Sequence, residues 1–130
     1  MTESLEFFSE ASALAEVRLR LRGFLSAVNL GEDEAGRIVL AIDEACTNII
    51  RHAHGGEAKP VRLTMERRSD RLVFVLIDQG GPCDPELIRG RSLREVRPGG
   101  LGVHIIREVF DVVDYLPTET GTRLTLEKRI

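Results

Sequence analysis

The stretch LAIDEACTNIIRHAHGG, residues 40–56, combines apolar and polar residues in a regular pattern. With a step of 100° per residue, its apolar positions and those just before it fall on one helix face, and its polar positions fall on the other. The apolar face holds Ile38, Val39, Ile42, Ala45, Cys46, Ile49, Ile50 and Ala53, and the polar face holds Arg37, Glu44, Thr47, Asn48 and Arg51. The pattern predicts an amphipathic helix with one face in a core.

Glu44 and Asn48 lie one turn apart on the polar face of this helix. Asn is a poor residue for a helix interior, because its amide competes for backbone hydrogen bonds. Two interpretations are open at this point. The pair consists either of solvated residues, which helical periodicity alone favours, or of two groups that share a ligand.

Flanking segments add further helices and strands. Helical spacing predicts a helix over 11–28, and the acidic residues in GEDEAGR open the helix that continues through residues 40–51. A Gly/Pro/Arg-rich loop follows from Gly80 to Gly100, and GVHIIREVF after it predicts another helix. Strands are predicted for SLEFFS, PVRLTMERR, RLVFVLID, DVVDYL and TRLTLEKR. This order predicts an α+β two-layer sandwich, in which a mixed, mostly antiparallel sheet has its helices on one face.

The composition limits the class of protein. A chain of 130 residues with 42% hydrophobic and 30% charged residues fits a single globular domain, 1–130. No apolar run approaches the ~20 residues needed to span a bilayer, and the acidic start MTESLEFFSE lacks the basic region of a signal peptide, so we expect a cytoplasmic protein without membrane contact. A net charge of −3 and the absence of Trp argue against direct nucleic-acid binding.

Cysteine and histidine residues do not form a recognisable metal motif. Cys46 and Cys83 make no C-x-x-C pair and are best explained as free thiols. His52 and His54 would lie ~160° apart on an extended helix, so their side chains would diverge. The sequence therefore predicts no His/Cys metal site.

Two other segments carry ligand-binding signals. In VLIDQGGPCDP, Asp78 ends an apolar strand before Gly80, so it is either part of an ordinary turn or a hydrogen-bond acceptor for an exocyclic amine such as that of adenine. In RPGGLGVHII, the glycines from Gly99 onward precede and open a helix, so they form either a flexible turn or a phosphate site. The usual P-loop and dinucleotide motifs are absent from the chain.

Taken in order, these signals resemble the GHKL (Bergerat-fold, histidine-kinase-like) ATPase superfamily: Glu-x-x-x-Asn, Asp-x-Gly, Gly-Gly-x-Gly and then TGT before the last strand. Within it, DEACTNIIRHAH, DQGGPCDP and GGLGVHII look most like the bacterial anti-sigma-factor serine kinases, over essentially the whole chain. The resemblance implies the Bergerat fold, ATP and Mg²⁺ as cofactors, and two protein partners, a sigma factor and a STAS-domain antagonist. A homodimer is left open.

The resemblance also implies roles for individual residues. Glu44 matches the general base that takes a proton from a partner's serine, and Asn48 matches the residue that supplies an oxygen to Mg²⁺. Asp78 matches the carboxylate that contacts adenine, Gly80 the glycine that admits the ring, and Thr122 a supporting hydroxyl on the adenine side. The loop between Asp78 and Gly99 corresponds to the family's lid, and the glycine-rich residues on the phosphate side of its end are matched by Gly100, Leu101 and Gly102.

Some residues depart from the pattern or stay ambiguous. Pro82 stands where many members have a second glycine, and Cys83 follows at a usually apolar position, which puts the hinge of the lid in doubt. Arg18 resembles a partner-contacting arginine, but a solvent-facing helix residue fits equally well. The arginines of the lid could meet phosphates, meet an acidic partner or be solvated; they are Arg89, Arg91, Arg94 and Arg97.

The sequence therefore predicts an ATP-dependent protein serine kinase that is also an anti-sigma factor and phosphorylates a STAS-domain antagonist. Two alternatives are an ATP-binding adaptor or anti-sigma module without kinase activity and a detached catalytic domain of a histidine kinase. Glu44 at the position of the base favours the kinase over the module. The short lid favours it over the histidine kinase.

Overall fold

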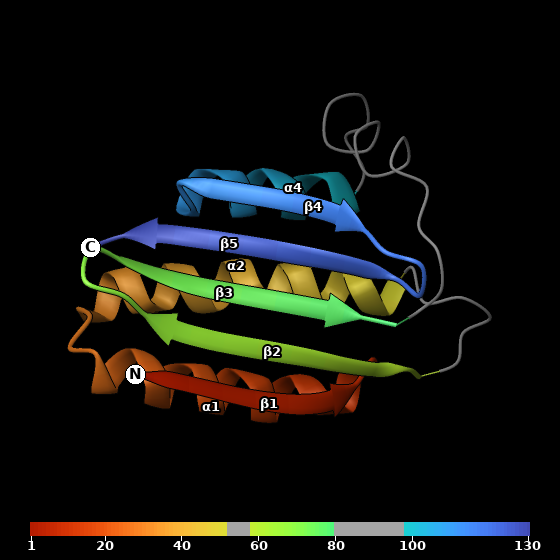
Figure 1. The fold of residues 1–130 in the computed structure, drawn as a ribbon, viewed down its shortest axis with the longest axis horizontal. Coiled ribbons are helices and arrows are strands. Elements are labelled where there is room, and N and C mark those ends of the chain that lie inside the picture. Colours follow the sequence, from red (N-terminus) through yellow and green to blue (C-terminus); the bar gives the residue numbers. More distant parts are fainter. Residues whose placement is uncertain (52–57, 80–97) are drawn as a thin grey trace.

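The computed structural model describes residues 1–51, 58–79 and 98–130, with the backbone alone for 98–103. Within them, five strands form one sheet in the order β1-β2-β3-β5-β4, and the helices lie together on one face of it (Figure 1). All four neighbouring pairs are antiparallel. The predicted two-layer sandwich is confirmed, but the sheet of the described strands is wholly antiparallel, where the sequence predicted a mixed one. The strands are β1 (Thr2–Phe8), β2 (Pro60–Arg67), β3 (Arg71–Asp78), β4 (Val112–Pro117) and β5 (Thr122–Arg129).

The helix layer begins with a 3₁₀ turn, η1 (Ala11–Ala13), which leads into α1 (Leu14–Ala27). Asn29, with φ 59°, closes α1, and the N–H of Leu30 donates to the carbonyl of Leu25 at 3.1 Å. This left-handed cap reverses the chain into α2 (Glu32–Arg51), the helix of the opening stretch. Three acidic residues in the first turn of α2 face the positive end of its dipole.

The last helix, α4 (Pro98–Val109), begins four residues before the predicted GVHIIREVF segment. The prediction of loop up to Gly100 is therefore wrong for its last residues. Proline suits the first helical position, because its fixed φ is helical and the N–H it lacks would have no partner there. Gly99 and Gly100 consequently lie inside the first turn of α4, where the backbone N–H groups have no partner within the helix.

The core fills the space between the sheet and the helices. Phe74 of β3 packs edge-to-face against Phe24 of α1 and Phe110, with ring centroids 6.1 and 5.8 Å apart. The predicted apolar face of α2 is buried from Ile38 to Cys46. Burial, followed by the charge of Asp43, raises the pKa of the Cys46 thiol to about 12, so this thiol is neutral and unreactive in the folded protein.

The described helices bear on the expectation about membranes as well. None of them is long and apolar enough to cross a bilayer.

Candidate functional site

The elements that carry the candidate residues meet at one end of the molecule. Figure 1 shows that β3 and α2 end, and β5 and α4 begin, at the same end of the molecule, on the right of the view. Helix α2 also packs against α4. The fold thus brings the Glu44–Asn48 turn, the end of β3 and the Gly-rich helix start to the same end of the sheet.

Asn48 carries the strongest signal in this region. Its side-chain oxygen, Oδ1, is fully buried and accepts no hydrogen bond from any residue that the structure describes. A buried acceptor without a donor costs about 1–3 kcal/mol, and native proteins usually satisfy such atoms with water, a ligand or an ion. An amide oxygen suits Mg²⁺, which takes one or two protein oxygens and completes its shell with phosphates and water. Asn48 therefore fits the role of magnesium ligand.

Neighbouring polar residues of α2 divide into two groups. Thr47 donates its hydroxyl to the carbonyl of Asp43 at 2.8 Å, and the Asp43 carboxylate pairs with Arg18 Nη1 of α1 at 2.7 Å. The side chains of Glu44 and Asn48 make no hydrogen bond or ion pair with the described residues, although both residues are half-buried. One side of the polar face thus joins α2 to α1, and the other side is available to a ligand.

This division also bears on Arg18, for which the sequence left two interpretations. Its guanidinium pairs with Asp43 while 45% of its side-chain surface stays exposed. The sequence does not reveal Asp43 as its partner, because the two residues come from different helices, 25 positions apart. The ion pair holds the guanidinium of Arg18 at Asp43, the residue that precedes Glu44 in α2.

On the sheet side, Asp78 is the last residue of β3 and is half-buried. Its register partner on β5 is Thr122, which is only 9% exposed. Asp78 and Thr122, both of which the resemblance assigned to the adenine side, are therefore direct cross-strand neighbours, although they are 44 positions apart in the sequence. Such a pair can present a carboxylate and a hydroxyl to the same ligand.

Gly121 is a residue of this site that sequence analysis missed. A Cβ atom on Gly121 would lie 2.0 Å from the carbonyl oxygen of Asp78 and 2.8 Å from its Oδ1. The backbone at position 121 therefore lies directly against the candidate adenine-contacting residue. The only available signal was the glycine in TGT just before Thr122, and the sequence does not reveal which strand that glycine approaches.

Several predicted residues cannot be placed. Gly80 and the Pro82–Cys83 departure lie outside the described residues, as do His52, His54 and the four lid arginines. Gly100, Leu101 and Gly102 lie in the early turns of α4, described by their backbone only. Within the described part of the chain, no three His, Cys, Asp or Glu residues form a group that could hold a metal ion.

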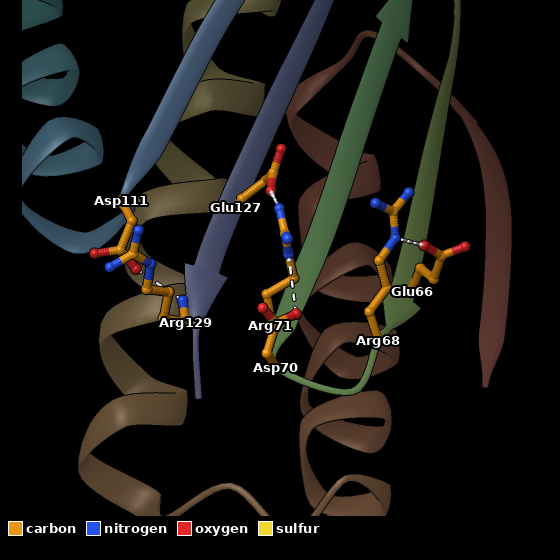
Figure 2. Close-up of polar contacts among 7 residues, drawn as sticks. All are labelled: Glu66, Arg68, Asp70, Arg71, Asp111, Glu127 and Arg129. Atoms are coloured by element: carbon orange, nitrogen blue, oxygen red, sulfur yellow. Dashed lines mark hydrogen bonds and ion pairs between the residues drawn. The ribbon is translucent and has the colours of Figure 1, made fainter.

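Charged residues at the opposite end of the sheet satisfy one another (Figure 2). Arg71 contacts Glu127 at 2.7 Å and Asp70 at 3.1 Å, and Arg68 pairs with Glu66. The Asp111 carboxylate accepts the backbone N–H of Arg129 at 2.7 Å. The hydrogen bond from Arg71 is the main cause that lowers the pKa of Asp70.

An antiparallel sheet covered by helices on one face, with a carboxylate at a strand end and a buried amide oxygen on α2, fits a histidine-kinase-like nucleotide-binding fold. Comparison with protein families agrees. Residues 7–128 match the model of the histidine kinase-like ATPase domain. The chain belongs to this family, whose ligand is ATP.

Similar curated proteins are named serine-protein kinase RsbW. The relative from Halalkalibacterium halodurans is 28% identical over 120 residues, which are 86% of this chain and 73% of the relative. That from Staphylococcus epidermidis is 28% identical over 132 residues, or 94% of this chain and 82% of the relative. These identities are modest, but the alignments span most of both proteins.

Solved structures confirm the fold. The crystal structure of the RsbU and RsbW domains of a Mycobacterium tuberculosis protein gives a TM-score of 0.67 at 18% identity, over 98% of this chain and 32% of that one. The histidine kinase domain of a blue-light activated kinase from Erythrobacter litoralis gives 0.61 at 18% identity, over 88% and 60% of the two chains. At these identities the likeness concerns the fold alone.

Proposed function

We propose that this protein is a cytoplasmic, ATP- and Mg²⁺-dependent protein serine kinase that also binds a sigma factor and phosphorylates a STAS-domain antagonist. The observation that carries the proposal is the buried Oδ1 of Asn48, which has no hydrogen-bond partner among the described residues and lies one helical turn after Glu44. The curated relatives that are named serine-protein kinases support the type of reaction. The sigma factor, the antagonist and the kinase reaction come from the sequence resemblance.

In this proposal, each part of the site binds one part of the nucleotide. Asp78 accepts a hydrogen bond from the adenine amine, Thr122 supports it from the neighbouring strand, and Gly80 admits the ring. The start of α4 binds the phosphates, because its first backbone N–H groups lack helical partners and the helix dipole favours negative charge. Of the residues that the resemblance assigns to the phosphates, Gly100 belongs to this first turn, and Leu101 and Gly102 follow it in the helix.

Metal binding and proton transfer are assigned to Asn48 and Glu44. Asn48 offers its Oδ1 to Mg²⁺, which would neutralise phosphate charge and help to position the phosphates. Glu44 receives the proton of the serine hydroxyl as phosphoryl transfer proceeds. The ion pair of Asp43 with Arg18 joins the same helix to α1, and Thr47 bonds within α2 to the Asp43 carbonyl, so the two site residues share a rigid support.

Nucleotide binding is tested first through Asp78. Mg·ATP at 100 times its dissociation constant should stabilise the wild type by about 2.7 kcal/mol, which is a rise in melting temperature of roughly 5–15 °C. Asp78→Asn removes a charged acceptor and should weaken binding by about 1.5–3 kcal/mol. Asp114→Asn is the matched control, because Asp114 is an exposed carboxylate on β4.

The result of this titration decides the nucleotide part of the proposal. If the wild type shows no thermal shift, or if Asp78→Asn shifts as much as the wild type does, the protein does not bind ATP as proposed. A shift that is lost in Asp78→Asn and kept in Asp114→Asn supports the assignment.

Kinase activity is tested separately, with purified protein, γ-labelled ATP and a STAS-domain protein. Transfer of label to a serine of that protein supports the kinase. If the wild type binds ATP and a sigma factor but transfers no phosphate, it is an ATP-binding anti-sigma module. Label on a histidine of another protein would instead identify a detached histidine-kinase domain.

A further inference from the structure

The turn between β4 and β5 is closed by Thr118 and Gly121. The backbone N–H of Thr118 donates to the carbonyl of Gly121 at 2.8 Å, and the N–H of Gly121 donates to the Thr118 hydroxyl at 2.9 Å. Both backbone polar groups of Gly121 are therefore bound by the same residue. The glycine is buried, whereas Glu119 and Thr120 at the tip of the turn are exposed.

Gly121 is pressed against Asp78 of the neighbouring strand. A Cβ there would lie 2.0 Å from the Asp78 carbonyl oxygen, 2.8 Å from its carbonyl carbon and 2.8 Å from Oδ1. The carbonyl belongs to β3, which is paired on both sides by β2 and β5, so the backbone has little room to move away. Gly23, Gly31 and Gly36, by contrast, would meet nothing within 4 Å.

We propose that Gly121, held by Thr118, is a positioning residue that fixes the Asp78 carboxylate and thereby sets the preference of the site for a purine with an exocyclic amine. This inference rests on the proposed ATP site. A carboxylate accepts hydrogen bonds only, so it attracts the 6-amino group of adenine and repels the 6-oxo group of hypoxanthine. Both effects depend on where Oδ1 lies, and Gly121 occupies the space beside that atom.

The test measures dissociation constants for Mg·ATP and Mg·ITP, two nucleotides that differ at position 6 of the purine. The wild type should prefer ATP. Gly121→Ala should lower the ATP-over-ITP ratio about tenfold or more, because the added methyl group displaces the acceptor. Gly36→Ala is the matched control: it adds the same methyl group in open space on α2, and its ratio should equal that of the wild type.

A second pair of variants tests the positioning role without a clash, in case Gly121→Ala does not fold. Thr118→Val removes the hydroxyl that accepts the Gly121 N–H and should lower the ATP-over-ITP ratio less than Gly121→Ala does. Thr118→Ser keeps the hydroxyl and should restore the wild-type ratio. A purely structural turn would lower the melting temperature in Thr118→Val and leave the ratio unchanged.

The outcomes separate this inference from the proposed function. If the wild type binds ATP in an Asp78-dependent way but the ratio is unchanged in Gly121→Ala, or in Thr118→Val where the first variant is unfolded, the positioning role is wrong and the ATP site stands. If the wild type binds neither nucleotide, both fail. A ratio that falls in both variants and is preserved in Gly36→Ala and Thr118→Ser supports the positioning role.

Discussion

The two ends of the sheet hold similar polar residues in opposite ways. At the end drawn in Figure 2, arginines and carboxylates that are exposed or partly exposed satisfy one another, as Arg71 does with Asp70 and Glu127. At the other end, Asn48 Oδ1 is buried without a partner in the described structure, and Asp78 is confined by Gly121. At the first end these charged groups have partners within the protein, and at the second end a buried acceptor has no donor among the described residues.

This difference separates stability from function. Exposed ion pairs add little to stability, because water screens them and ordering two long side chains costs entropy. A buried, unsatisfied amide oxygen lowers stability, and a ligand that binds it removes the cost. Substitutions at the two ends should therefore change different quantities.

The largest effect is expected from Glu44→Gln. The change keeps the size of the side chain but removes the basic oxygen, so phosphotransfer to the STAS-domain protein should fall by ~10²–10⁴-fold while ATP binding is retained. Single-turnover transfer and nucleotide titration measure the two quantities. Glu108→Gln, at an exposed position of α4, serves as the control. Transfer at the wild-type rate in Glu44→Gln would remove Glu44 from the mechanism.

Asn48→Ala should produce opposite changes in binding and in stability. Loss of the oxygen should weaken Mg·ATP binding by roughly 10–100-fold. The difference in ATP affinity between the variant and the wild type should be smaller when EDTA removes the metal. Without nucleotide, the free energy of unfolding should rise by about 1–2 kcal/mol, because an unsatisfied acceptor is gone and Ala favours the helix.

Thr47→Ala is the control for this experiment, since it brings a similar gain in helix propensity but removes a hydroxyl that already has a partner. Urea unfolding should show a larger stabilisation for Asn48→Ala than for Thr47→Ala. If Asn48→Ala stabilises the protein no more than Thr47→Ala does, the Asn48 oxygen has a hydrogen-bond partner in the free protein. The two ends of the sheet would then no longer differ in this respect.

The smallest effect is expected from Arg71→Gln. ATP binding should stay unchanged, and the melting temperature should fall slightly at low salt and less in 1 M NaCl, where the Debye length is about 3 Å. Arg71 lowers the pKa of Asp70 in the folded protein. The Arg71–Asp70 pair therefore stabilises the folded state above the unfolded pKa of 3.8, and this stabilisation is lost as the pH falls through the lower folded pKa. The melting-temperature difference from the wild type should therefore vanish in acid, as thermal scans over pH can check. A loss of ATP affinity would show that the two ends are coupled.

Much of the fold was predictable because its signals are periodic. The alternation in PVRLTMERR and the apolar run RLVFVLID indicated β2 and β3, and helical spacing indicated α1 and α2. The start of α4 was predicted four residues too late, because the two glycines suggested a loop and the helix-compatible proline before them was overlooked. The roles of all the site residues remain predictions, as does the binding of phosphates by the Gly-rich start of α4; these residues are Glu44, Asn48, Asp78, Gly80 and Thr122.

By itself, the sequence determined which residues belong to one helix face or one strand, because neighbours along the chain share a fixed geometry. That was sufficient to place Glu44 beside Asn48 and to put Asp78 at the end of a strand. Only the tertiary structure decided that Arg18 pairs with Asp43, that Thr122 lies opposite Asp78 and that Gly121 is pressed against it. Such contacts join distant segments through sheet register and helix packing, and these depend on how the whole core fits together.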